Sequence, residues 1–136
     1  MTQIANIQLE QFIKQLPDRV WQALTDPVLH AQWWAPGDVR PVVGHRFTLD
    51  MGPAFGQQTC EVLAVENERL FSYAFAPGTL NTTITWRLQP QSSGTRLFLE
   101  QAGFDLDSPL GKLAFNGMSA GWPNILTRIE PLLSAS

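Results

Sequence analysis

Hydrophobic and polar residues alternate along six segments of the chain, and this period of two residues predicts six β-strands. The clearest segment is 82–89, where Ile84, Trp86 and Leu88 are separated by polar residues. The predicted strands span residues 4–14, 45–51, 59–65, 70–76, 82–89 and 95–101. Because most of these strands have one apolar and one polar face, we expect an antiparallel sheet with one side in water. In the first strand the alternation slips near residues 12–13, which predicts a β-bulge there.

Three other segments show helical signals. Residues 17–24 begin with a proline and an aspartate, which suit the first turn of a helix. A second short helix is expected over residues 27–34. A period near 3.6 residues returns over 110–133 and predicts a long C-terminal helix. Pro123 lies within that helix and predicts a kink or a restart there.

The predicted order of elements is β-α-α-β-β-β-β-β-α, with five consecutive strands ahead of the last helix. This order indicates an α+β fold in which a curved antiparallel sheet wraps around the long C-terminal helix. A sheet and a helix arranged in this way seldom close completely, so we expect a pocket between them. The length of 136 residues fits one domain, and we expect residues 1–136 to form it.

Charged residues are few and unevenly spread. They make up 15% of the chain, whereas about 25% is typical of soluble domains. Residues 70–86 and 113–127 contain no Asp, Glu, Lys or Arg. One interpretation is that Ser, Thr and Asn give these two stretches enough polarity. The other is that the predicted fold brings the two stretches face to face across an apolar site.

The composition also excludes several classes of protein. A net charge of −3 leaves no basic stripe for phosphates, which argues against nucleic-acid binding. Cys60 is the single cysteine, so neither an intrachain disulfide nor a multi-cysteine metal site can form. No run of 18 apolar residues is present, so we expect no membrane span. The N-terminus lacks the basic start and apolar stretch of a signal peptide, and we expect a cytoplasmic protein.

Residues suited to catalysis or metal binding are scarce. The chain has no HExxH, GxSxG, P-loop or GxGxxG motif. We expect His30 on the surface of the second short helix, and His45 beside solvent or a nearby carboxylate. Arg46 and Glu100 lie on the polar faces of their strands. Cys60 is expected to be a small core residue, with a reactive cavity thiol as the alternative. We therefore expect no metal, no cofactor and no catalytic residue.

The candidate binding site consists of aromatic and neutral polar side chains that should face the gap between sheet and helix. The candidates are Trp33, Trp34, Phe47, Met51, Phe71, Tyr73, Phe75, Trp86, Gln101, Phe115, Met118 and Trp122. Several of them must be plain core residues. Tyr73, Gln101 and Asn116 are the neutral polar groups that could orient a ligand. A lining so poor in charge favours a neutral, apolar or aromatic ligand, since a buried ion would need a partner.

Several short motifs, in matching order and spacing, resemble one family over nearly the whole chain. They are 20–27 (VWQALTDP), 32–36 (QWWAP), 44–47 (GHRF), 62–65 (VLAV), 68–70 (ERL), 94–99 (GTRLFL), 102–104 (AGF) and 121–122 (GW). Together they resemble the SRPBCC (START/Bet v 1-like) superfamily, and within it the branch similar to the activator of Hsp90 ATPase homologue 1. The resemblance implies a helix-grip fold, in agreement with the predicted order of elements. Many members carry a histidine at the position of Gln101, so any proton transfer by that histidine would be missing here.

The resemblance leaves the function open, because the family includes apolar-ligand binders, a few cyclases and chaperone-binding domains. Our preferred hypothesis is a non-enzymatic module that binds a hydrophobic or aromatic small molecule, lipid-like or polyketide-like, between sheet and helix. The second is an enzyme of cyclase, dehydratase or hydrolase type that uses the same cavity. The third is a chaperone- or protein-binding module of the Hsp90-activator type. Formation of a homodimer through an uncharged surface also stays open.

Overall fold

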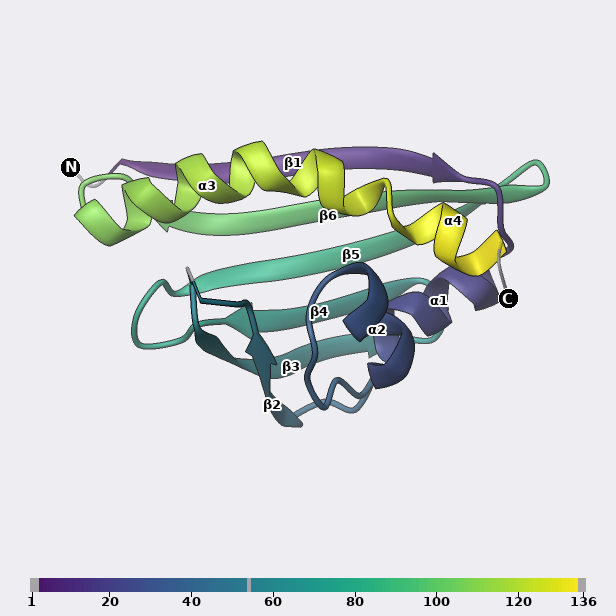
Figure 1. Cartoon of the computed structure of the whole chain (residues 1–136), viewed down its shortest axis with the longest axis horizontal. Coiled ribbons are helices and arrows are strands. Elements are labelled where there is room, and N and C mark those ends of the chain that lie inside the picture. The colour runs from purple at the N-terminus through teal and green to yellow at the C-terminus, as the bar shows by residue number, and fades with distance from the viewer. Residues whose placement is uncertain (1–2, 54, 135–136) are drawn as a thin grey trace.

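The computed structural model describes residues 3–53 and 55–134 (Figure 1). Its elements are β1 (Ile4–Ile13), α1 (Pro17–Thr25), α2 (Pro27–Trp33), β2 (Arg46–Asp50), β3 (Gln57–Glu66), β4 (Leu70–Phe75), β5 (Thr82–Gln91), β6 (Gly94–Asp105), α3 (Pro109–Leu126) and α4 (Ile129–Ser134). The six strands form one antiparallel sheet in the order β1-β6-β5-β4-β3-β2. The predicted α+β fold is therefore confirmed, with two short helices after the first strand and a long helix after the last.

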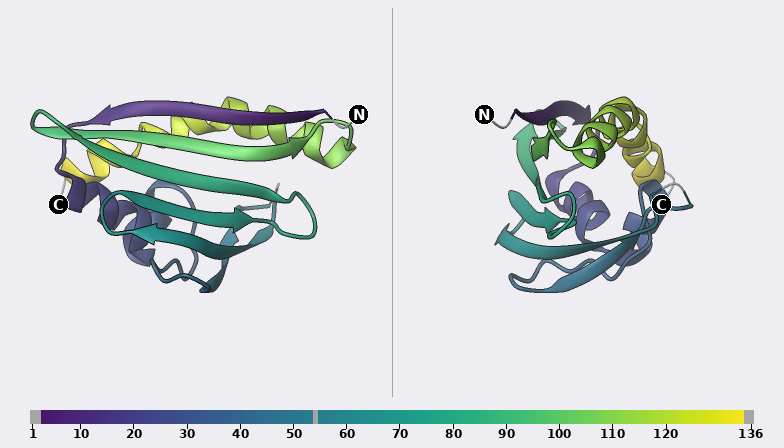
Figure 2. Two further views of the ribbon diagram at one scale, coloured as in Figure 1. Left: turned by 180° about the vertical axis from the view of Figure 1, so that it is seen from behind. Right: turned by 90° about the vertical axis from the view of Figure 1, so that its left-hand side faces the viewer.

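The sheet is strongly curved, and the helices lie on its concave side. The end-on view in Figure 2 shows the strands bending around the helices. In Figure 1, α3 runs along β6 and β1. The helices α1, α2 and α4 gather beyond the C-terminal end of α3. The alternation in β5 matches this arrangement, because Ile84, Trp86 and Leu88 are buried while Arg87 and Gln89 are exposed.

A close approach between the end of β6 and the start of α3 fixes where the long helix begins. A Cβ atom on Gly111 would collide with the backbone carbonyl of Asp105, so only glycine fits at this position. The hydroxyl of Ser108 caps the helix by accepting a hydrogen bond from the N–H of Gly111 at 3.4 Å. This junction directs α3 back across the concave face of the sheet.

The β-bulge of the first strand lies elsewhere than we expected. The pairing of β1 with β6 shifts between Ala5 and Asn6, and it runs without interruption through Phe12 and Ile13. Phe12 lies on the outer face of the sheet, where its ring is 5.9 Å from the guanidinium carbon of Arg96. The prediction was wrong because an aromatic residue on the solvent face imitates a change of period in the sequence.

The C-terminal helical region is divided, but the division does not fall at Pro123. The helix α3 continues through Pro123 to Leu126, and α4 begins at Ile129 after a turn at residues 127–128. The restart predicted at the proline therefore occurs after Leu126. Of the helices in the described residues, none is both long and apolar enough to cross a membrane.

Candidate ligand-binding site

A cavity of about 540 Å³ lies between α3, the end of α2 and the turns that join β2 to β3 and β4 to β5. The residues that line it are Trp34, Met51, Phe55, Gln57, Gln58, Phe75, Thr79, Leu80, Leu110, Ala114, Gly117, Met118, Gly121, Trp122, Ile125 and Arg128. Small-molecule sites in proteins typically measure about 300–1,000 Å³. The cavity therefore has the size that a small organic molecule needs.

One continuous face of α3 forms a long wall of this cavity. Its lining residues recur every three or four positions, at Leu110, Ala114, Gly117, Met118, Gly121, Trp122 and Ile125. This is the spacing of a single helix face. Because a helix rises about 1.5 Å per residue, the face from Leu110 to Ile125 is about 22 Å long. The cavity is thus elongated along the helix.

Two glycines leave this wall without side chains on successive turns of α3. A Cβ atom on Gly121 would meet nothing closer than Cδ1 of Ile125 at 3.9 Å. A Cβ atom on Gly117 would lie 3.4 Å from the ring of Phe55. Glycine inside a helix costs about 1 kcal/mol relative to alanine. The two glycines therefore lower the stability of the helix and leave open volume in the cavity.

We expect Gly121→Ala to raise the free energy of unfolding by about 0.5–1 kcal/mol, because alanine is the better helix former and its methyl group has room. Urea denaturation measures this change. Gly78→Ala is the matched control, since Gly78 has a φ of 86° in the β4–β5 turn and alanine should destabilise the protein there. A destabilising Gly121→Ala would mean that Gly121 does not face open space.

The apolar centre of the cavity is a cluster of aromatic rings. The ring of Trp34 lies 4.7 Å from that of Trp122 and 6.3 Å from that of Phe75, measured between centroids. Behind this wall, Trp33 lies 5.9 Å from Trp34, and Trp86 lies 5.6 Å from Trp122. These separations are within the range in which aromatic pairs attract one another. The wall is therefore supported by a second layer of rings.

Gln101 holds two wall residues in place from behind. Its Oε1 accepts a hydrogen bond from Nε1 of Trp122 at 2.9 Å. Its Nε2 donates to the hydroxyl of Thr82 at 3.1 Å and lies 3.4 Å from the sulfur of Met118. Gln101 is fully buried, and both ends of its amide are bonded within the protein. It therefore positions the wall instead of pointing a free polar group at a ligand.

The cavity offers few polar groups to a ligand. The indole N–H of Trp34 makes no hydrogen bond within the described part of the chain, and the side chain is only half-buried. Gln57 adds an exposed amide near the turn between β2 and β3. Arg128, which follows α3, is the one lining residue among those described that carries a charge. The centre of the cavity can thus interact with a ligand mainly through apolar contact.

Of the twelve candidates from the sequence, the structure brings five to the cavity wall: Trp34, Met51, Phe75, Met118 and Trp122. The other seven do not line the cavity: Trp33, Phe47, Phe71, Tyr73, Trp86, Gln101 and Phe115. All seven lie in the protein interior or, like Phe115, pack partly buried against it. The alternating pattern identifies which side chains of a strand point inward. It does not tell which of these side chains are covered by other residues and which line the cavity.

The wall residues missing from the sequence-based set come from turns, from the start of β3, and from α3 and the turn that follows it. They are Phe55, Gln57, Gln58, Thr79, Leu80, Leu110, Ala114, Gly117, Gly121, Ile125 and Arg128. Extending the helical period from Trp122 in both directions would have identified the residues on α3. The turn residues reach the cavity only through tertiary contacts, for which the sequence gives no local signal.

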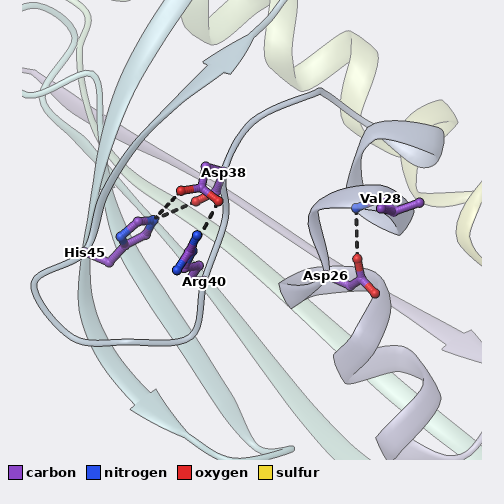
Figure 3. Close-up of polar contacts among 5 residues, drawn as sticks. All are labelled: Asp26, Val28, Asp38, Arg40 and His45. Carbon is purple, nitrogen blue, oxygen red and sulfur yellow. Dashed lines mark hydrogen bonds and ion pairs between the residues drawn. The ribbon is translucent and has the colours of Figure 1, made fainter.

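Groups suited to acid–base chemistry lie outside the cavity wall. Nε2 of His45 is 2.6 Å from the backbone carbonyl of Asp38 and 3.7 Å from its carboxylate (Figure 3). The same carboxylate lies 3.2 Å from Nε of Arg40. Arg46 and Glu61 form an ion pair of 2.9 Å on the outer side of β2 and β3. His45 thus lies beside a carboxylate, and none of these five residues lines the cavity.

His30 is buried, which corrects our expectation of a surface histidine. The helix that carries it, α2, is capped by the carboxylate of Asp26, which accepts the N–H of Val28 at 2.9 Å (Figure 3). His30 is 1% exposed, and its Nδ1 lies 2.7 Å from the carbonyl of Ala35. Burial lowers the pKa of His30 to about 4. The neutral imidazole packs 5.2 Å from the ring of Trp34 and so supports the cavity wall.

Cys60 and Tyr73 are core residues of the sheet. Cys60 is fully buried, and burial raises the pKa of its thiol to about 12. The hydroxyl of Tyr73 accepts a hydrogen bond from Nε1 of Trp86 at 3.1 Å, and burial raises the pKa of this phenol as well. Neither residue lines the cavity. A reactive thiolate in the cavity therefore has no support from this geometry.

The fold and the cavity together define the class of protein: a helix-grip domain, in which a curved antiparallel sheet holds a long helix over an apolar cavity. Residues 15–134 match the family described as activator of Hsp90 ATPase homolog 1-like protein. The chain belongs to this family, and the resemblance found in the sequence is confirmed.

Solved structures of similar proteins share the architecture. The chain is 34% identical to protein MLL2253 from Mesorhizobium loti, over 97% of this chain and 98% of that one, with a TM-score of 0.86. It is 18% identical to Aha1 from Colwellia psychrerythraea, described as a dimer, over 95% and 96% of the two chains, with a TM-score of 0.79. It is 24% identical to DynU16, of the dynemicin biosynthetic locus, over 95% of this chain but 47% of DynU16, with a TM-score of 0.76. The last two likenesses show the fold alone. A search of curated proteins finds no match.

Proposed function

We propose that this chain binds a hydrophobic or aromatic small molecule, lipid-like or polyketide-like, in the cavity between its sheet and α3. The observation that carries the proposal is a cavity of about 540 Å³ whose centre consists of Trp34, Phe75, Met118 and Trp122. Removing apolar surface from water contributes about 25 cal/mol per Å². An apolar ligand gains this free energy on entering, whereas an ion at the centre would find no partner. The place of DynU16 in a biosynthetic locus is consistent with such a role.

Two alternatives have less support. An enzyme of cyclase or hydrolase type would need a titratable acid or base on the wall, but His45, Arg46 and Glu61 lie elsewhere. Arg128 does line the cavity, but a guanidinium does not deprotonate near neutral pH. A chaperone- or protein-binding role, or a homodimer, rests on the family description and on the dimeric Colwellia protein. Size-exclusion chromatography tests for the homodimer directly.

The neutral dye N-phenyl-1-naphthylamine tests the proposal, because its fluorescence rises when it leaves water for an apolar site. We expect the wild-type protein to bind the dye and Gly121→Leu to bind it about 5- to 150-fold more weakly, since overpacking costs about 1–3 kcal/mol. The leucine would extend from α3 into space that the ligand needs. A fluorescence titration gives both dissociation constants.

Ala120→Leu is the matched control for this experiment. Ala120 is the neighbouring residue on α3, is exposed and does not line the cavity. The control adds a larger side chain to the same helix on its outer side, so we expect its affinity for the dye to stay within about twofold of wild type, the change that exposed sites usually cause. Equal losses in both variants, or binding that neither variant weakens, would place the dye outside the cavity.

A further inference from the structure

Arg128 is the one charged group among the described residues of the cavity lining, and it lies at one end of the cavity. It follows α3 in the turn that leads to α4, where its backbone N–H donates to the carbonyl of Ile125 at 3.1 Å. The uncharged stretch 113–127 ends immediately before it. Leu110 lies at the other end of the same helix face, about 22 Å or more away along the helix axis. The cation is therefore separated from most of the apolar wall.

The guanidinium of Arg128 has no ionic partner in the described part of the chain. The ion pairs found there join Arg40 and His45 to Asp38, Arg46 to Glu61, and Arg96 to Glu10. The side chain of Arg128 also makes none of the hydrogen bonds found among these residues. Its five N–H donors are thus available to a molecule in the cavity.

The position of Arg128 also avoids the cost of burying a charge. Its side chain is exposed, so an anion held there keeps part of its contact with water. A guanidinium can bind a carboxylate or a similar acid through two parallel hydrogen bonds. A ligand with an acidic group at one end could place that group against Arg128 and its apolar body against Trp34 and Trp122.

We propose that the ligand of this cavity is an amphiphilic acid, and that Arg128 binds its acidic group while the aromatic wall binds its apolar body. This inference rests on the proposed ligand-binding function. It narrows the ligand class from any hydrophobic molecule to an elongated one with a single anionic end. Arg128 becomes the residue that selects acids over neutral analogues of the same shape.

A purely structural role for Arg128 is the competing explanation. The last carbonyl groups of a helix carry partial negative charge, and a basic residue near them stabilises the helix. Under that explanation, replacing Arg128 would lower thermal stability and would change the affinities for acidic and neutral ligands equally.

Two dyes with the same aromatic rings separate these explanations. N-Phenyl-1-naphthylamine is neutral, and 1-anilinonaphthalene-8-sulfonate adds one sulfonate. We expect Arg128→Gln to weaken binding of the sulfonate about tenfold, the scale of a hydrogen bond to a charged group, with little change for the neutral dye. Arg87→Gln is the matched control, because Arg87 is an exposed arginine on β5 that does not line this cavity. Raising the salt concentration should weaken the preference for the sulfonate in wild type and not in Arg128→Gln.

The results of this experiment test the role of Arg128 separately from the proposed ligand-binding function. The inference is supported if Arg128→Gln loses affinity for the sulfonate dye alone and Arg87→Gln loses affinity for neither dye. If the neutral dye binds in the cavity and Arg128→Gln leaves the ratio of the two affinities unchanged, the inference is overturned and the ligand-binding function stands. If neither dye binds, both proposals fail. Sulfonate binding that survives Gly121→Leu would place the anion outside the cavity and would also overturn the inference.

Discussion

Gln101→Leu should destabilise the protein by about 2–4 kcal/mol, since it leaves buried hydrogen-bonding groups without a partner. Leucine fills nearly the same volume but cannot accept the hydrogen bond from Nε1 of Trp122 or donate to Thr82. Both partners are about 1% exposed, so water cannot replace the lost bonds. Urea denaturation, monitored by far-ultraviolet circular dichroism, gives the free energy of unfolding.

Gln8→Leu provides the control for this substitution. Gln8 lies on the exposed face of β1, and its Nε2 donates to the carboxylate of Glu100 at 2.8 Å. Because water can replace that bond, we expect a change within about 0.5 kcal/mol. Similar effects at Gln8 and Gln101 would show that the buried amide does not hold the wall. The surviving folded fraction of Gln101→Leu should also bind N-phenyl-1-naphthylamine more weakly, since Trp122 would no longer be fixed.

Lowering the pH from about 6.5 to 4 should cost the protein up to about 3 kcal/mol through His30 alone. The pKa of His30 is about 4 in the folded protein, whereas the pKa of an unburied histidine is 6.5. Between these two values the unfolded chain binds more protons than the folded one, so stability falls as the pH falls. The contribution is fully present above pH 6.5. Burial beside Trp34, in a site without a carboxylate partner, is the physical cause.

A variant without a titratable group at this position isolates the effect of His30. Asparagine can place an amide near the position of Nδ1 and can still donate to the carbonyl of Ala35. The free energy of unfolding of His30→Asn, measured in urea at several pH values, should fall less steeply than that of wild type between pH 6.5 and 4. The difference between the two curves removes the contribution of the carboxylates, which both proteins share. Parallel curves would mean that His30 is protonated equally in the folded and unfolded states.

The architecture could be predicted from the sequence because the sheet repeats its signal many times. The strands β2 and β5 alternate over at least five residues, and the exceptions in the other strands do not hide the period. Local exceptions are where the predictions failed. Phe12 is apolar but lies on the outer face, so it imitated a bulge, and His30 is polar but buried against Trp34. Phe12 contacts Arg96 of the neighbouring strand, and His30 contacts the carbonyl of Ala35, and these contacts override the ordinary preference of each residue type.

The cavity could be predicted only in part, for a different physical reason. A strand residue such as Tyr73 or Trp86 points inward in the same way whether it meets a helix, another ring or empty space. The positions of α2 and α3 decide which residues stay uncovered, since Trp33 of α2 and Trp122 of α3 both pack against Trp86. The small residues that create the volume, such as Gly121, carry no chemical signal of their own. Arg128 lies one residue beyond the uncharged stretch 113–127, so the charge pattern gives no signal that it lines the cavity.

The chain carries its own internal control for the central claim that a ligand binds between the sheet and α3. Of its five tryptophans, Trp34 and Trp122 line the cavity, whereas Trp21 packs in α1 against Phe71 at 6.0 Å between ring centroids. Each indole N–H gives a separate signal in a proton–nitrogen correlation spectrum. The most direct test is therefore to titrate the labelled protein with N-phenyl-1-naphthylamine and follow these signals.

The predicted result is a saturable shift of the Trp34 and Trp122 signals, with the Trp21 signal unchanged. Saturation should occur at the same dissociation constant that dye fluorescence gives. Binding of the dye that leaves Trp34 and Trp122 unmoved, or that shifts Trp21 as much as either of them, would contradict the claim.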